Sequence, residues 1–361
     1  MSDEPSVGQA LWHVAPRTSR LRSARVPRPG PGQVTVRSTV SLVSAGTEML
    51  VYRGQVGPDE ETGLETCEGG FGFPIKYGYQ VVGEVVAAGE GVRFPTGAVV
   101  FARHPHQDLF TMNDDPHLLF GVPDPVPAER AVFANLLDVA VNCLLDVPVR
   151  FGDCVVVHGQ GTVGSLCGQL ARRTAGTVIV VDPVDRRREA ALAWGADAAV
   201  DVADLAEAVD DLSAGRGADV SIEASGSPAA LRSALATTGQ EGTIAVVSYF
   251  GSREVTLRLS PEFHYRRQRV VSSQVAALGS GLQPRWTTSR RMDAVFALLA
   301  EPWLRTPISH TLDFRDAPAA YELIDRAAEP MTGVLLVYDA RRISTTAAES
   351  SSPRPPESAA R

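Results

Sequence analysis

The sequence lacks the features that mark several classes of protein. Its 361 residues include only four cysteines, none at Cys-x-x-Cys spacing, so a disulfide framework is not predicted. No apolar run approaches the ~20 residues that a transmembrane helix needs, and the N-terminus lacks the order of a secretory signal. The net charge is −8 and no long basic tract occurs, which argues against nucleic acid as a partner. We therefore expect a cytoplasmic protein that does not bind membranes and acts on a small molecule.

The most informative feature that the sequence does contain is a glycine-rich turn. Three valines precede Gly159, and Gly161 and Gly164 complete a Gly-x-Gly-x-x-Gly pattern. This pattern predicts a buried strand, a tight turn and a helix whose first N–H groups face a pyrophosphate. A second predicted strand, residues 177–181, ends in Asp182, at the spacing of about 20 residues expected for a ribose-binding acid. The alternative is a glycine turn in another α/β unit. The dinucleotide-binding residues predicted here are Gly159, Gln160, Gly161, Thr162, Val163, Gly164 and Asp182.

The residue at the end of the second strand also predicts the coenzyme. A carboxylate at Asp182 accepts hydrogen bonds from the 2′-OH of NAD and repels the 2′-phosphate of NADP. Three arginines at 186–188 could offset this repulsion, so NADP stays an alternative, although such a run could equally be a solvated helix face. We include Arg187 among the coenzyme-binding residues and expect NAD.

The pattern of apolar residues changes between the two halves of the chain. Residues 1–146 contain short β-like runs bounded by Gly and Pro, such as 33–39 and 81–88, followed by a helical stretch at 128–146. They predict an antiparallel, barrel-like domain. Residues 147–283 alternate between strands and helices, which predicts a doubly wound parallel sheet. Strands are expected near 154–158, 177–181, 199–202, 218–222 and 243–248, and helices near 163–175, 185–194 and 228–237.

Two more strands are expected after the parallel sheet, at 254–259 and 269–273. An exposed strand there could pair with the sheet of a second subunit, so we expect a homodimer.

The rest of the chain is expected to complete the first domain. Residues 284–340 contain an expected helix at 289–300, another at 317–328 and an apolar strand at 333–338. Residues 341–361 are rich in Ser, Pro, Ala and Arg and are predicted to form a disordered tail.

The chain resembles the medium-chain dehydrogenase/reductases, of which the zinc alcohol dehydrogenases are one branch. The resemblance covers about residues 9–340. Its matching stretches are Ser44-Ala45-Gly46-Thr47-Glu48, Gly78-Tyr79-Gln80 with the strand that follows, Gly89-Glu90-Gly91-Val92, Asp182 to Asp197, and Glu223-Ala224-Ser225-Gly226. The resemblance implies an α/β fold with a GroES-like β-barrel-type domain and a Rossmann doubly wound parallel sheet. It also implies that Ser225, Ser248 and Gln274 lie along the nicotinamide half of the coenzyme.

Within that family the chain is similar to a zinc-poor subgroup that includes the bacteriochlorophyllide dehydrogenases. Zinc members have a metal-binding Cys before the Gly-Thr pair and a Gly-His-Glu motif, whereas this chain has Ala45, Tyr79 and Gln80 at those positions. An alanine, a phenol and an amide cannot replace a thiolate, an imidazole and a carboxylate around Zn²⁺. No cysteine occurs between Cys67 and Cys143, so the four-cysteine lobe for structural zinc is also missing. We expect no zinc at either family site.

Without a metal, the protein must supply a hydrogen-bond donor for the developing alkoxide and a route for one proton. The resemblance places Thr47 where relatives keep a relay hydroxyl and Tyr79 in place of a metal ligand. We expect Tyr79 as proton donor, Thr47 as relay and Glu48 as the residue that orients them. The structural alternatives are a half-buried barrel residue for Tyr79, a helix cap for Thr47 and a partly solvated carboxylate for Glu48.

Several other polar residues have two interpretations. His104 and His106 lie two apart and could bind a metal, but the intervening proline and the lack of a third ligand favour a surface loop. A place at the cleft edge is the alternative for His106. His264 could make a structural hydrogen bond or contact substrate, and His158 is expected in the core or the turn. Residues 59–61 are expected to form a solvated acidic turn, or to steer a cationic substrate.

These observations predict a zinc-independent NAD(P)-dependent oxidoreductase that acts on a secondary alcohol or its ketone, in a biosynthetic pathway. One alternative is a quinone or enoyl reductase of the same fold. Another is a dinucleotide-binding protein that has lost catalysis. The sequence does not name the substrate, because fold does not fix chemistry.

Overall fold

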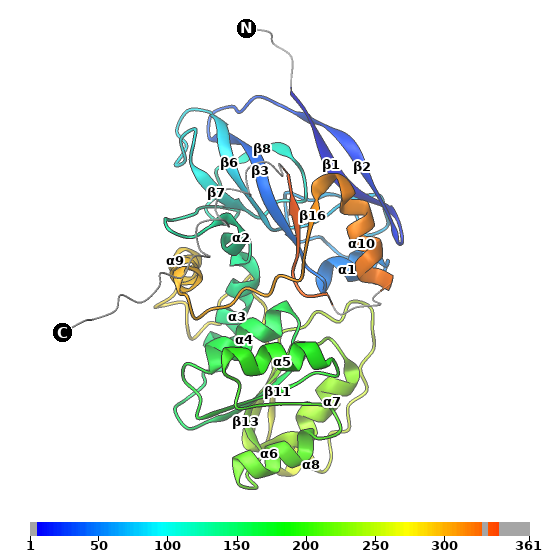
Figure 1. Ribbon diagram of the computed structural model, residues 1–361, viewed down its shortest axis with the longest axis vertical. Coiled ribbons are helices and arrows are strands. Elements are labelled where there is room, and N and C mark those ends of the chain that lie inside the picture. The colour runs from blue at the N-terminus through cyan, green and yellow to red at the C-terminus, as the bar shows by residue number, and fades with distance from the viewer. Residues whose placement is uncertain (1–5, 327–330, 339–361) are drawn as a thin grey trace, which may run out of the picture.

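The computed structural model describes residues 6–326 and 331–338. They form two lobes along the long axis of the molecule, an antiparallel β lobe above and a parallel α/β lobe below (Figure 1). The expected tail at 341–361 lies outside the described residues, as do the last two residues of the helix expected at 317–328. The α/β fold, with a sheet-rich GroES-like domain and a Rossmann-type parallel sheet, is confirmed.

The upper lobe consists of two sheets. One has the strand order β2-β1-β5-β4; the other has the order β16-β17-β3-β6-β7-β9, with β8 paired to β3. The long strand β3 (Gln33–Val43) contributes buried residues to three hydrophobic clusters, and its register shifts twice against β6. The other bounds are β1 Ser6–Ala15, β2 Thr18–Val26, β4 Glu68–Gly69, β5 Ile75–Lys76, β6 Val81–Ala88, β7 Val99–Ala102, β8 Leu109–Asn113, β9 Leu119–Gly121, β16 His310–Asp313 and β17 Val334–Val337.

The lower lobe is built on a parallel sheet with the order β12-β11-β10-β13-β14-β15. All five residues of the central strand β10 are buried, as its run of valines predicts. The direction of winding reverses between β10 and β13, which is where doubly wound sheets bind ligands. The bounds are β10 Cys154–His158, β11 Thr177–Val181, β12 Ala198–Val200, β13 Ala218–Glu223, β14 Thr238–Val246, β15 Arg269–Ser272, α4 Thr162–Ala171, α5 Asp185–Trp194, α6 Leu205–Ser213, α7 Pro228–Thr237 and α8 Glu262–Tyr265.

Two expectations for this lobe need correction. The strand expected at 254–259 is wrong, because this segment forms no backbone ladder. Its alternate apolar residues Val255 and Leu257 instead pack on the cluster around α7. Helix α6 is an element that the sequence analysis did not include, although its buried residues Leu205 and Val209 are four apart, as in an amphipathic helix.

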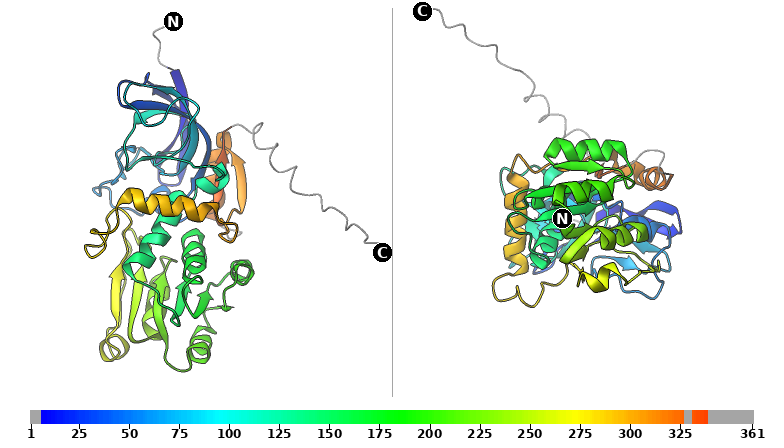
Figure 2. Two further views of the ribbon diagram at one scale, coloured as in Figure 1. Left: turned by 90° about the vertical axis from the view of Figure 1, so that its left-hand side faces the viewer. Right: turned by 90° about the horizontal axis from the view of Figure 1, so that it is seen from below.

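The remaining helices connect the lobes. The chain returns to the upper lobe after β15, where β17 inserts between β3 and β16. Helix α9, capped by the Thr287 hydroxyl, crosses the junction between the lobes (Figure 2). The helical stretch expected at 128–146 is two helices, α2 and α3. The bounds are α1 Thr47–Tyr52, α2 Ala128–Ala131, α3 Ala134–Asp146, α9 Thr288–Ala300 and α10 Ala317–Arg326.

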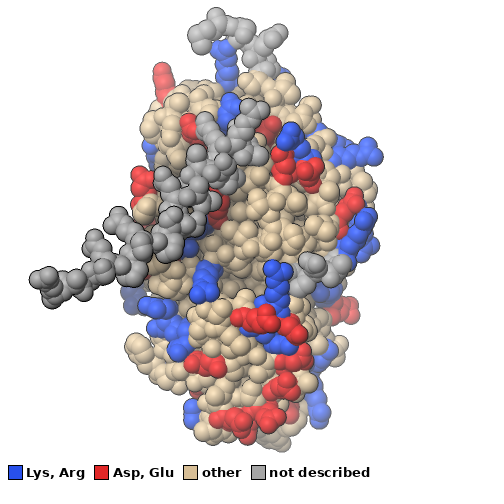
Figure 3. All heavy atoms as spheres, viewed as in Figure 1, with Lys and Arg blue, Asp and Glu red and all other residues tan. Residues whose placement is uncertain are grey.

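The described surface is mixed in charge. On the face shown in Figure 3, acidic and basic side chains are interspersed. Cys154 and Cys167, which flank the glycine turn and are expected in the core, are buried free thiols, and so is Cys143. Among the described residues, none of the helices has the length and apolar character that a membrane span requires.

Candidate functional site

The glycine turn leaves space at one position and is closely packed at the others. Gly159 has φ +94°, and a Cβ there would lie 2.7 Å from the Cβ of Ser225. A Cβ on Gly164 would lie 1.9 Å from the carbonyl oxygen of Gly159, which fixes the close approach of α4 to the turn. Gly161, by contrast, caps α4 and has no atom within 4 Å of its missing Cβ. The turn therefore has room for a diphosphate beside the first N–H groups of α4, at Thr162 and Val163.

Asp182 lies beside this turn and is buried. Its Oδ2 accepts a hydrogen bond of 2.7 Å from the backbone N–H of Gln160, and its Oδ1 accepts one of 2.9 Å from Val184. Arg187 Nη1 lies 3.5 Å from Oδ2 and its Nη2 donates to the carbonyl of Met331. Since a carboxylate can accept about four hydrogen bonds, Asp182 keeps capacity for a ribose hydroxyl.

Of the three arginines that follow Asp182, Arg187 is the one that reaches the carboxylate. Arg188 bonds the backbone carbonyl of Asp182 and pairs with Asp185 and Asp201. Arg186 is exposed. Only one of the three arginines therefore lies close to the position that a 2′-phosphate would occupy.

The residues expected beside the nicotinamide also lie at the carboxyl edge of the parallel sheet. The buried Glu223, at the end of β13, accepts hydrogen bonds from the backbone and hydroxyl of Ser225. The hydroxyl of Ser248 accepts a bond from the N–H of Gly226, and Gln274 comes two residues after β15. The structure therefore brings Ser225, Ser248 and Gln274 to the same edge as the glycine turn.

Tyr79 and Thr47, the expected proton donor and relay, lie close together. The side chains of Ser44 and Thr47 are near enough to the Tyr79 hydroxyl to lower its pKa. Burial, and then the nearby charge of Glu48, raise the pKa of Tyr79 above its usual value. The structural alternative for Thr47 is wrong, since Gly46 is the cap of α1 and no side chain caps this helix. Tyr79 is 8% exposed, so it is more buried than a half-buried barrel residue would be.

Glu48 is buried completely, so the interpretation as a partly solvated carboxylate is wrong. Its Oε1 accepts a hydrogen bond of 3.0 Å from the N–H of Ser44. Its Oε2 accepts the hydroxyl of Tyr321 and lies 2.9 Å from Nε2 of His106. Among the described residues, Glu48 makes no hydrogen bond with Thr47; its link to the hydroxyl pair is the hydrogen bond with the backbone of Ser44.

The surface loop expected at His104 and His106 is wrong, because both side chains are buried. Nδ1 of His106 lies 2.7 Å from the hydroxyl of Ser41, and its ring packs on Gly78, where a Cβ would lie 3.1 Å from Nε2. His104 lies outside this cluster, and its ring stacks on that of Phe110 with 3.7 Å between the ring centroids. The described part of the chain contains no group of three or more His, Cys, Asp and Glu that could hold a metal.

The other sequence candidates lie apart from this cluster. His264 is exposed on α8, at the lower end of the α/β lobe (Figure 1). His158 is buried in β10, as expected, and neither ring nitrogen has a partner among the described residues. The acidic turn at 59–61 is exposed, as expected, although the carboxylate of Glu60 accepts the hydroxyl of Tyr249 from the other lobe.

Sequence reasoning missed Ser44 and Tyr321. Ser44 is the first residue of the matched stretch at 44–48, so its position was a usable signal. Tyr321 lies on α10, 273 residues from Glu48 along the chain, and no local pattern marks it.

Comparisons with known proteins find related dehydrogenases. The model of the family described as zinc-binding dehydrogenase matches residues 162–292. A D-guloside 3-dehydrogenase of Shigella flexneri is 30% identical over 263 residues, covering 71% of this chain and 75% of that protein. A 2-desacetyl-2-hydroxyethyl bacteriochlorophyllide A dehydrogenase of Cereibacter sphaeroides is 31% identical, but over 48% of this chain and 57% of that protein. The subgroup resemblance therefore stays a prediction.

Solved structures show the same fold. A dehydrogenase from E. coli, solved with NADH, has a TM-score of 0.75 at 18% identity and covers 92% of this chain and 100% of its own. Its likeness extends over both lobes. Together with the relative that is 30% identical over three quarters of its length, these comparisons show that the chain belongs to the zinc-binding dehydrogenase family of medium-chain dehydrogenase/reductases and is an NAD(P)-dependent dehydrogenase.

Proposed function

We propose that this protein interconverts a secondary alcohol and its ketone with NAD(P), and that Tyr79 rather than zinc handles the reacting oxygen. The observation that carries the proposal is the buried hydroxyl of Tyr79 with the side chains of Thr47 and Ser44 close to it, where the family resemblance places the metal of the zinc members. Asp182 supports NAD as the preferred coenzyme. A biosynthetic role stays a prediction.

The bound coenzyme supplies or accepts the hydride. In the direction of reduction, the Tyr79 hydroxyl donates a hydrogen bond to the carbonyl oxygen and passes its proton as the alkoxide forms. The raised pKa keeps this hydroxyl protonated at neutral pH, which a donor requires. Thr47 and Ser44 lie close to it and relay a proton from solvent water back to Tyr79 after each turnover.

The buried carboxylate of Glu48 has two parts in this scheme. It fixes the backbone of Ser44, so the Ser44 hydroxyl keeps its place beside Tyr79. Its negative charge also disfavours a phenolate at Tyr79. The contacts with His106 and Tyr321 keep this carboxylate in one orientation.

The zinc that the family name implies does not fit these residues. Ala45 has no ligand atom, and the amide of Gln80 donates to the carbonyl of Leu42. The nearby His106 and Glu48 pair with each other. A phenol and an amide are poor substitutes for imidazole and carboxylate ligands, so we derive no step through a metal.

We expect metal analysis of the purified protein to find far less than one zinc per chain. Incubation with EDTA should leave turnover and Tm unchanged, because no ligand set depends on a metal. One tightly held zinc per chain, lost in the Tyr79→Ala or Glu48→Ala variant, would contradict the zinc-independent mechanism.

The reaction class is tested in two steps. NADH is first expected to quench tryptophan fluorescence, and turnover is then measured on alcohols, ketones and enones. We expect turnover of secondary alcohols or ketones. Turnover of enones alone would favour an enoyl or quinone reductase, and binding without turnover of any class would favour a protein that has lost catalysis.

We also propose a homodimer joined along β15. This strand is the last of the parallel sheet, and Val270 on it is 41% exposed. An unpaired, partly apolar edge is typical of strands that pair with a second chain. A mass corresponding to one chain in light scattering would contradict it.

A further inference from the structure

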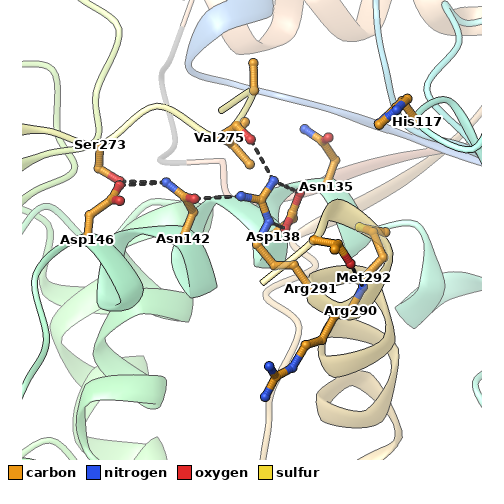
Figure 4. Close-up of polar contacts among 12 residues, drawn as sticks. His117, Asn135, Asp138, Asn142, Asp146, Ser273, Val275, Arg290, Arg291 and Met292 are labelled. Carbon is orange, nitrogen blue, oxygen red and sulfur yellow. Dashed lines mark hydrogen bonds and ion pairs between the residues drawn. The ribbon is translucent and has the colours of Figure 1, made fainter. Parts of the chain in front are cut away.

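Three consecutive residues after β15 are held by two of the helices that connect the lobes. The hydroxyl of Ser273 donates to Asp146 at 2.8 Å. Nδ2 of Asn142 lies 3.5 Å from the carbonyl oxygen of Gln274. Arg291 donates to the carbonyl of Val275 at 2.6 Å (Figure 4). The segment 273–275 is therefore fixed by α3 and α9.

Arg291 is the centre of these contacts. It is 2% exposed, and its guanidinium donates to both oxygens of Asp138, at 2.5 and 3.1 Å, and to Oδ1 of Asn142 at 2.6 Å. Asp138 is itself fully buried and also accepts Arg103 at 2.9 Å. Buried ion pairs of this kind add little net stability, because desolvation offsets their attraction. Instead, these ion pairs hold the side chains that form them in a fixed geometry.

The order of the strands gives this segment its place relative to the coenzyme. Asp182, expected at the adenosine ribose, follows β11, and the glycine turn follows β10. A dinucleotide that passes from Asp182 across the turn continues toward β13, β14 and β15. The N–H of Ser273 bonds the carbonyl of Val246 at the end of β14, so residues 273–275 lie at the edge that the nicotinamide half reaches.

We propose that Arg291 is a positioning residue for the nicotinamide half of the coenzyme. It fixes the Val275 carbonyl directly, and it orients Asn142, which in turn holds Ser273 and lies beside the Gln274 carbonyl. The nicotinamide wall is thus set by α3 and α9, outside the strands and helices of the parallel sheet. The inference rests on the proposed placement of the coenzyme along this edge.

The test compares NADH with ADP-ribose, which has the adenosine and diphosphate but no nicotinamide. Arg291→Lys keeps a positive charge beside Asp138 but cannot reach Asn142 and Val275 together. We expect the Kd of NADH, measured by calorimetry, to rise about tenfold, a change of about 1.4 kcal/mol. The Kd of ADP-ribose should stay unchanged.

The matched control is Gln268→Leu. Gln268 is buried just before β15, at the end away from the crevice, and donates to the carbonyls of Leu235 and Thr238. This change is expected to lower Tm while leaving the ratio of the two Kd values as in the wild type. Asn142→Ala, which leaves the Arg291–Asp138 pair in place, is the second variant should Arg291→Lys not fold.

The outcomes distinguish the role of Arg291 from the placement of the coenzyme. Equal weakening of NADH and ADP-ribose by Arg291→Lys, or an unchanged ratio in Asn142→Ala, would show a purely structural role and overturn the inference alone. A wild-type protein that binds neither molecule would overturn the coenzyme placement as well.

Discussion

Replacing Tyr79 by Phe is expected to lower kcat by about 10²-fold or more, the usual contribution of a positioned proton donor. The ring stays in its buried place, and only the hydroxyl close to Thr47 and Ser44 is lost. The alkoxide then forms without a hydrogen bond or a proton, so the barrier rises in both directions. The Kd of NADH should not change, because the lost group faces the reacting oxygen of the substrate.

The control is the same chemical change two residues away. Tyr77 is also buried, and its ring lies 6.0 Å from that of Tyr79 in an edge-to-face arrangement. Tyr77→Phe is therefore expected to retain most of the turnover. An unchanged rate in Tyr79→Phe, or equal losses in both variants, would remove Tyr79 from the mechanism.

Acid is expected to destabilise the protein steeply below pH 6.5. Burial lowers the pKa of His104 to about 3 and those of His13 and His158 to about 4. Lys76 and His106 lower the pKa of His104 further, whereas Glu48 partly opposes the change at His13. In the unfolded chain each imidazole has a pKa of about 6.5 and binds a proton that the folded protein excludes.

Proton linkage gives the direction in which the free energy of unfolding changes with pH. Between pH 6.5 and about 4 the unfolded state holds more protons, so the free energy of unfolding falls as the pH falls. Each histidine removes about 1.4 kcal/mol per pH unit, or about 2 kcal/mol between pH 6.5 and 5. Three such groups together approach the total stability of about 5 to 15 kcal/mol typical of a protein.

Urea unfolding at pH 7 and pH 5 measures this effect. His158 offers the sharpest variant, because its two ring nitrogens have no partner among the described residues. His158→Phe is expected to reduce the pH dependence by about one histidine's share, about 2 kcal/mol over this range. A free energy of unfolding that is equal at pH 5 and pH 7 would contradict the expectation.

Features that depend on neighbouring residues could be predicted from the sequence. The glycine turn and Asp182 follow from local pattern and spacing, because a strand, a turn and a helix are adjacent in the chain. The contact of Tyr79 with Thr47 was expected through the family resemblance.

Features that depend on distant residues could not be predicted from the sequence. The burial of Glu48 depends on His106 and Tyr321, 58 and 273 residues away. The pair of Arg291 and Asp138 joins positions 153 residues apart. A charged residue in the sequence predicts exposure unless its partner is known. Burial therefore could not be predicted at these positions.

The insertion of β17 between β3 and β16 has a consequence for biosynthesis. The first lobe begins at β1, yet β3 keeps an open edge until residues 334–337 leave the ribosome. Translation at about 5 to 20 residues per second separates these two strands by roughly tens of seconds. The parallel sheet, which is continuous in the chain, is complete earlier, so the nascent protein can fold its second lobe before its first and must keep the exposed edge of β3 from aggregating meanwhile.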